Sequence, residues 1–234
     1  MKKALLLSSS GYKDTGYLNH CRPWINEFLT EHGVRDEEIL FIPYAGVRRT
    51  NDEYELKVQD CLQNKNIKSI HRFSDPKQAV KNAKVISIGG GNTFVLLHYL
   101  YKYDLVDAIR EKVEAGTPYF GWSAGANVAG GTIMTTNDMP IIMPKLFDAL
   151  NIFPHQINPH FISGKIAGHN GESREERLEE FLIVNQDSII YALPEGVGLK
   201  ISGNSAKILG NDAVLKMRYK KDTESIAVGD SFTF

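Results

Sequence analysis

A serine at position 123 lies in a pattern that could make it a nucleophile. Residues 118–127 read Pro-Tyr-Phe-Gly-Trp-Ser-Ala-Gly-Ala-Asn, so an apolar run breaks at Gly-x-Ser-x-Gly and continues into small helix formers. Glycine on both sides of the serine removes Cβ atoms that would clash in a sharp turn from strand to helix. An ordinary glycine turn is the alternative interpretation. The setting favours a nucleophile elbow, with the Ser123 hydroxyl exposed at the end of a strand.

Three consecutive glycines, Gly89 to Gly91, follow the apolar run 85–88. Their N–H groups could bind an anion at the start of a helix. The chain lacks the Lys-Ser or Lys-Thr of a P-loop and the Gly-x-Gly-x-x-Gly spacing of a dinucleotide site, which argues against a nucleotide. We favour an oxyanion hole made by the amides of Gly90 and Gly91 together with that of Ala124, the residue after the serine.

A serine nucleophile needs a base to take its proton, and the chain has seven histidines. Four of them fall in or beside regular elements and are better explained as surface or core residues: His20, His32, His71 and His98. His160 follows a proline and precedes an aromatic residue, in a segment that we predict to be a loop downstream of the serine. It is the preferred base. His155 and His169 remain open as alternatives.

The base usually needs a carboxylate that fixes its tautomer. Glu195 comes directly after the predicted strand 189–193, in the sequence Pro-Glu-Gly. The carboxyl ends of parallel strands share one edge of a sheet, so Glu195 should lie at the same edge as Ser123. Asp138 and Asp148 are the competing acids, and spacing does not decide among the three.

The first hundred residues alternate short apolar runs with amphipathic stretches. The runs are 4–7, 39–42, 67–70 and 85–88, and the stretches that follow them are 18–31, 53–63, 76–82 and 93–101. This alternation is typical of βαβ units. It predicts an α/β fold with a mostly parallel central sheet and helices on both faces. Ligands bind beyond the carboxyl ends of such strands, where residues 8–11 and 43–46 lie as well as the two glycine-containing segments.

The second half of the chain has a different pattern. Residues 132–159 lose any period and are rich in Pro, Asn, Thr and Met, which predicts a loop that carries function. Residues 172–184 have one apolar and one acidic face, as expected of a helix. The tail 198–234 alternates short strands with turns and predicts antiparallel edge strands. Nothing marks a second unit, so we expect one domain over residues 1–234.

Composition excludes several classes of partner. The 234 residues carry 27 basic and 28 acidic side chains, a net charge of −1, without the basic cluster that nucleic-acid binding needs. The apolar start at 4–7 is too short for a signal peptide or a membrane span, so we expect a cytoplasmic protein. Cys21 and Cys61 have no metal or redox spacing, and no His-x-x-x-His or carboxylate cluster suggests a metal. We expect neither metal nor cofactor, and leave monomer and homodimer open.

Six motifs occur along the chain in one order: Gly-Gly-Gly-Asn-Thr-Phe (89–94), Gly-Trp-Ser-Ala-Gly-Ala-Asn (121–127), Thr-Thr-Asn-Asp-Met-Pro (135–140), Gln-Ile-Asn-Pro-His-Phe (156–161), Gly-Glu-Ser-Arg-Glu-Glu-Arg (171–177) and Leu-Pro-Glu-Gly (193–196). Together they resemble the peptidase E family, whose members are serine peptidases that act as α-aspartyl dipeptidases. Segments 41–47 and 52–54 also match, so the resemblance covers nearly the whole chain. It implies a fold related to flavodoxin and to class I glutamine amidotransferases.

This resemblance implies a role for each site residue. Ser123 would be the nucleophile, His160 the base and Glu195 the acid that orients it. Arg174 would bind the aspartyl carboxylate of the substrate; by its position alone it would be a solvated partner for glutamates of its own helix. Asp138 falls on a family motif and is kept as a site residue without an assigned role.

The expected reaction is hydrolysis of Asp-Xaa dipeptides through an acyl-enzyme. A glutamine amidotransferase would need cysteine in place of Ser123 and usually a His-x-Glu pair, whereas the chain reads His160-Phe161-Ile162. Two alternatives on the same fold stay open. One is a cyanophycinase-like peptidase that cleaves β-aspartyl links, and the other is a small-molecule sensor without catalysis.

Overall fold

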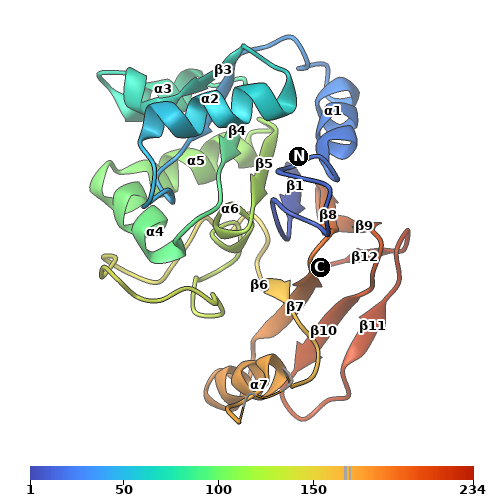
Figure 1. The fold of residues 1–234 in the computed structure, drawn as a ribbon. Coiled ribbons are helices and arrows are strands. Elements are labelled where there is room, and N and C mark those ends of the chain that lie inside the picture. The colour runs from blue at the N-terminus through green and yellow to red at the C-terminus, as the bar shows by residue number, and fades with distance from the viewer. Residues whose placement is uncertain (166–167, 169) are drawn as a thin grey trace.

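The computed structural model describes residues 1–165, 168 and 170–234, and its largest element is an eight-stranded sheet (Figure 1). The strand order is β12-β9-β8-β1-β5-β4-β2-β3. The parallel strands are β1 (Lys3–Leu7), β2 (Ile39–Ile42), β3 (Ile67–Ser69), β4 (Val85–Ile88) and β5 (Tyr119–Trp122). The antiparallel strands are β8 (Val197–Ser202), β9 (Ser205–Gly210) and β12 (Ser231–Thr233). The predicted α/β fold, with a mostly parallel sheet and antiparallel C-terminal strands, is confirmed.

Helices cover both faces of this sheet. One face packs against α1 (Arg22–Glu31) and α2 (Asn51–Leu62). The other packs against α3 (Pro76–Asn82), α4 (Thr93–Lys102), α5 (Leu105–Glu114) and the short α6 (Ala124–Asn127). A 3-10 turn, η1, spans Ile70–Arg72. Helix α5 is absent from the predicted alternation of strands and helices.

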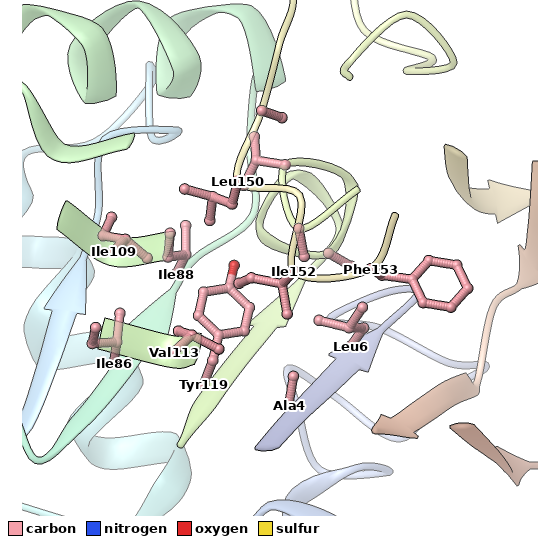
Figure 2. Packing of buried hydrophobic residues seen from close by; sticks show 14 of the residues in the cluster. Ala4, Leu6, Ile86, Ile88, Ile109, Val113, Tyr119, Leu150, Ile152 and Phe153 are labelled. Carbon is pink, nitrogen blue, oxygen red and sulfur yellow. The ribbon is translucent and has the colours of Figure 1, made fainter. Parts of the chain in front are cut away.

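Alternate side chains of β1 enter the two cores, as the period of a strand requires. Leu5 and Leu7 belong to the cluster under α1 and α2, and Ala4 and Leu6 to the cluster on the opposite face. Figure 2 shows side chains of β1, β4, β5 and α5 meeting three residues of the segment that follows α6: Leu150, Ile152 and Phe153. This segment therefore closes one side of the core.

A second sheet of four strands has the order β11-β10-β7-β6. Its strands are β6 (Gln156–Phe161), β7 (Ile189–Pro194), β10 (Val214–Arg218) and β11 (Glu224–Ile226). Helix α7 (Arg174–Val184) packs on it through Leu178 and Leu182, which contact Phe161 and Ile190 in one apolar cluster. In Figure 1 this sheet and α7 lie below the larger sheet. The predicted strands of the C-terminal tail are therefore divided between two sheets.

The predicted loop 132–159 is only partly a loop. Residues 128–155 contain no helix or strand apart from an isolated bridge between Thr132 and Asp148, but Gln156 begins strand β6. The loop prediction was wrong there because Pro159 and a shift in strand register hide the period of this strand. None of the helices in the described part of the chain is long and apolar enough to span a membrane.

Candidate active site

Ser123 lies between the end of β5 and the start of α6, in the strand-turn-helix setting expected of an elbow. Its backbone has φ 54° and ψ −115°, a conformation that residues other than glycine rarely adopt. The glycines beside it allow α6 to pack closely. A Cβ on Gly125 would lie 2.1 Å from the carbonyl oxygen of Ile88, and one on Gly121 would lie 2.6 Å from that of Gly125. Side chains at either position would push the helix away from the sheet.

The structure brings Ser123, His160 and Glu195 together in one chain of hydrogen bonds. The Ser123 hydroxyl lies 3.0 Å from Nε2 of His160, and Nδ1 of His160 lies 2.7 Å from Oε1 of Glu195. A carboxylate can only accept, so Nδ1 carries the proton, and Nε2 presents its lone pair to the serine. This arrangement can take the serine proton and stabilise the imidazolium that results. Residues that are 35 and 37 positions apart along the chain are therefore hydrogen-bonded to each other.

His160 and Glu195 are brought together by adjacent strands of the smaller sheet. His160 lies near the end of β6 with φ 53°, and Glu195 follows the last residue of β7. Glu195 and Gly196 form the whole connection between β7 of the smaller sheet and β8 of the larger one. This short link holds the carboxylate where the two sheets meet.

The other histidines considered as the base lie elsewhere. His155 packs against the rings of Phe153 and Tyr191, at 5.3 and 5.5 Å between ring centres, and burial lowers the pKa of its imidazole. His169 lies outside the described residues. His20 is near enough to Glu195 for the carboxylate to raise its pKa, although burial is the larger effect and lowers it. Among the histidines that the structure describes, only His160 hydrogen-bonds the hydroxyl of Ser123.

Asp138 and Asp148 make no hydrogen bond or ion pair with the imidazole of His160 in the described part of the chain. The carboxylate of Asp138 accepts hydrogen bonds from the backbone N–H and the hydroxyl of Thr93, at 2.8 and 2.6 Å. It thereby ties the loop after α6 to the first turn of α4. Asp148 contributes its backbone carbonyl to Tyr101, at 2.8 Å. The structure thus places Asp138 where it can fix the glycine loop that precedes α4.

That glycine loop packs directly on the serine. A Cβ on Gly90 would lie 3.0 Å from Cβ of Ser123, and one on Gly91, at φ 138°, would lie 2.1 Å from the carbonyl oxygen of Ala45. Within the described residues, no hydrogen bond uses the N–H of Gly90 or Gly91. Ala124 is the first residue of α6, so its N–H has no partner within the helix. These amides are available to a negatively charged oxygen.

Tyr54, on α2, hydrogen-bonds the same loop, and the sequence alone predicted no role for it. Its hydroxyl donates to the carbonyl oxygen of Gly90 at 2.8 Å and lies 3.3 Å from the hydroxyl of Tyr17. Burial raises the pKa of both tyrosines, so both hydroxyls stay protonated and can donate. Sequence pattern shows only a buried aromatic on a helix. The contact joins residues 36 positions apart, so no local signal could have identified it.

Arg174 is the first residue of α7 and lies beyond the segment 162–173 that follows β6. It is half-buried, and burial, with a smaller effect of Arg177, lowers the pKa of its guanidinium. It makes no ion pair with any described residue, so the glutamate partners suggested by its helical position are not seen. It also makes no hydrogen bond to the three residues above. As far as the described residues go, its charge is available to an anion.

Comparison with known proteins identifies the family. Residues 4–209 match the family model described as peptidase family S51. The chain belongs to peptidase family S51. It is 57% identical over 236 aligned residues to the peptidase E of Actinobacillus pleuropneumoniae serotype 7 (strain AP76), with all of both chains covered. It is 55% identical to the peptidase E of Haemophilus influenzae (strain PittGG), again over both full chains. The resemblance to peptidase E is confirmed.

Two solved structures share the fold of this chain. A crystal structure of a peptidase E protein from Listeria monocytogenes EGD-e superposes with a TM-score of 0.64 at 22% identity, covering 91% of this chain and 100% of that one. A peptidase from an acI-B1 actinobacterium gives a TM-score of 0.71 at 20% identity, covering 100% and 97%. At these identities the likeness concerns the fold. In the described part of this S51 chain, no three His, Cys, Asp or Glu side chains gather as metal ligands would.

Proposed function

We propose that the protein is a serine dipeptidase that hydrolyses dipeptides with an N-terminal aspartate. The observation that carries this proposal is the chain of hydrogen bonds from Ser123 through His160 to Glu195. It is supported by the S51 family match and by relatives named peptidase E that align over the full chain. Ser123 acts as the nucleophile, His160 as the base and Glu195 as the acid that orients it.

The reaction proceeds in two halves. In the first, Oγ of Ser123 attacks the carbonyl carbon of the aspartyl residue while Nε2 of His160 takes the hydroxyl proton. The amides of Gly90, Gly91 and Ala124 hold the oxyanion, and the proton passes to the leaving amine as the C–N bond breaks. In the second, His160 takes a proton from water, which attacks the ester. Aspartate leaves and the serine regains its proton.

A two-part experiment tests this proposal. A fluorophosphonate probe should label Ser123, because labelling needs an activated serine and no particular substrate. A panel of Asp-Leu, Asn-Leu, Glu-Leu, β-Asp-Leu and β-Asp-Arg should then show preference for Asp-Leu. Absence of labelling would favour a sensor without catalysis. Preference for β-Asp-Arg would favour a cyanophycinase-like peptidase.

Specificity for aspartate is predicted to depend on Arg174. A carboxylate that enters a pocket loses water, and a half-buried guanidinium that binds both its oxygens compensates for that loss. Arg174→Ala should therefore lower kcat/KM for Asp-Leu about 30-fold or more, since truncating one partner of such a pair costs about 2–5 kcal/mol. Asn-Leu, a poor substrate from the start, should lose much less. Arg174→Lys should recover only part of the difference, because it loses the two-pronged geometry.

Arg177→Ala is the matched control for this prediction. Arg177 lies on the same helix, is 57% exposed and pairs with Glu172, so its removal should leave the Asp-Leu to Asn-Leu ratio unchanged. The ratio of kcat/KM for Asp-Leu to kcat/KM for Asn-Leu is measured in the parent and in each variant, with folding checked by circular dichroism. A constant ratio in folded Arg174→Ala would place the carboxylate pocket elsewhere.

Tyr54→Phe tests the loop that carries the oxyanion amides. The Gly90 carbonyl and the Gly91 N–H belong to one rigid peptide unit, so the hydrogen bond from Tyr54 fixes the direction of that N–H. Its loss should lower kcat about 3- to 10-fold with little change in KM, as expected of a hydrogen bond worth about 0.5–1.5 kcal/mol. The hydroxyl of Tyr17 donates to the hydroxyl of Tyr54 and does not itself reach the glycine loop by a hydrogen bond between described residues. Tyr17→Phe should therefore have a smaller effect on kcat. Equal effects would argue that the loop is held by packing.

A further inference from the structure

The residue after β1, Ser8, connects the two strands that carry the base and the acid. Its side chain is fully buried, with 0% exposure. Its hydroxyl accepts a hydrogen bond from the backbone N–H of His160 at 2.9 Å and donates one to the carbonyl oxygen of Leu193 at 2.8 Å. His160 lies on β6 and Leu193 on β7, whereas β1 belongs to the other sheet. One hydroxyl thus joins three strands at the site.

The hydroxyl occupies a break in the ladder between β6 and β7. Asn158 pairs with Ala192 and Phe161 pairs with Pro194, so Pro159 and His160 together oppose the single residue Leu193. Such a bulge leaves backbone groups without their regular partners. Ser8 bridges the N–H of His160 and the C=O of Leu193 in place of a direct bond. The bridge requires a group that both donates and accepts, which a hydroxyl does.

The bulge also sets the unusual backbone of His160. Its φ of 53° is in the left-handed region, where a residue with a side chain is strained. Strained conformations of this kind persist only when their surroundings hold them. Ser8 binds the N–H of this very residue, and Leu193 precedes Glu195 by only two positions. The same side chain therefore acts on the strand ends that present both the imidazole and its carboxylate.

We propose that Ser8 is a positioning residue for proton transfer, which keeps the β6 bulge open so that His160 reaches Ser123 and Glu195 together. The proposal rests on the proposed function of the triad. In a variant without the hydroxyl, the N–H of His160 and the C=O of Leu193 lose their buried partner and close toward each other. The imidazole then shifts away from the serine. A displacement of about 1 Å in a catalytic group can lower the rate about 100-fold.

Ser8→Ala is the direct test. We expect kcat for Asp-Leu to fall about 30- to 100-fold while KM changes less than about 3-fold, because the substrate pocket is not altered. Ser8→Cys, which keeps a weak donor and acceptor of similar size, should give a kcat between those of Ser8→Ala and the parent enzyme. Ser69→Ala is the matched control. Ser69 is also fully buried with a hydrogen-bonded hydroxyl, to His71, but lies on the edge strand β3, so its loss should leave kcat unchanged.

A double-mutant cycle distinguishes a loss of positioning from a general loss of stability. If Ser8 acts through the imidazole, adding Ser8→Ala to His160→Ala should cause no further loss of the residual rate. A full further loss in the double variant, or a normal kcat in folded Ser8→Ala, would overturn the proposal. Should Ser8→Ala fail to fold, an unchanged kcat in folded Ser8→Cys would overturn it as well.

The rate of fluorophosphonate labelling keeps this test distinct from the test of the substrate. Labelling reports the activated serine without needing a particular dipeptide, and Ser8→Ala should slow it at least about 10-fold even if Asp-Leu proves the wrong substrate. Normal labelling in the variant would refute the role of Ser8 while leaving the dipeptidase proposal intact. A parent protein that neither labels nor hydrolyses any dipeptide would refute both.

Discussion

Ser123→Ala is expected to reduce hydrolysis of Asp-Leu to background, a loss of at least about 10⁴-fold. In the proposed mechanism, the change removes the atom that attacks the substrate. It leaves the elbow in place, because the backbone of Ser123 makes the turn: its N–H donates to Leu7 and its carbonyl accepts from Ala126 and Asn127. The thermal midpoint should therefore stay close to that of the parent. Rates are measured as kcat/KM on purified protein, with circular dichroism to verify the fold.

The control for this experiment is a neighbouring serine. Ser87 is buried on β4, and its hydroxyl has no hydrogen-bond partner in the described structure, so Ser87→Ala should retain activity. The probe that labels the parent should also label Ser87→Ala and fail to label Ser123→Ala. Full activity in folded Ser123→Ala would mean that the nucleophile is another residue.

His160→Ala is expected to lower kcat/KM by about 10³-fold or more, because members of a triad act as a unit. Without the imidazole the serine keeps its proton, and Glu195 has no partner to orient. The effect should fall on kcat far more than on KM, and labelling by the fluorophosphonate should slow in parallel. Stopped assays at high enzyme concentration measure the residual rate.

His155→Ala provides the contrast. His155 packs among aromatic side chains, so its removal should lower the thermal midpoint through lost packing while the folded fraction keeps a normal rate. Loss of activity in His155→Ala or His169→Ala, with normal activity in His160→Ala, would assign the base to one of the rivals.

The sequence predicted those features that depend on neighbours along the chain. The glycines around Ser123 indicated the elbow because the Gly-x-Ser-x-Gly spacing is itself local, although the closest clash that a Cβ on Gly125 would make is with Ile88 on another strand. Alternating apolar runs indicated the parallel sheet for the same reason. Helix α5 was not predicted, because it follows α4 after only two residues, without a strand between them. The period of β6 was hidden by Pro159 and the bulge.

Contacts between distant residues could not be predicted in this way. Spacing did not distinguish Glu195 from Asp138 or Asp148 as the acid, and the choice came from resemblance to a family. Ser8 and His160 are 152 positions apart, and the hydrogen bond between them exists only because two sheets meet. The division of the C-terminal strands between those sheets depends on the same packing, which no periodicity encodes.

The division of the site between two sheets has a mechanical consequence. Ser123 follows a strand of the larger sheet, whereas the imidazole of His160 and the carboxylate of Glu195 come from neighbouring strands of the smaller one and would move as a rigid pair. A small rotation at the junction would lengthen the distance from the serine oxygen to Nε2 and leave the distance from Nδ1 to the carboxylate unchanged. Mild heat or denaturant that loosens this junction would therefore inactivate the enzyme by moving Ser123 away from His160, while both sheets remain folded.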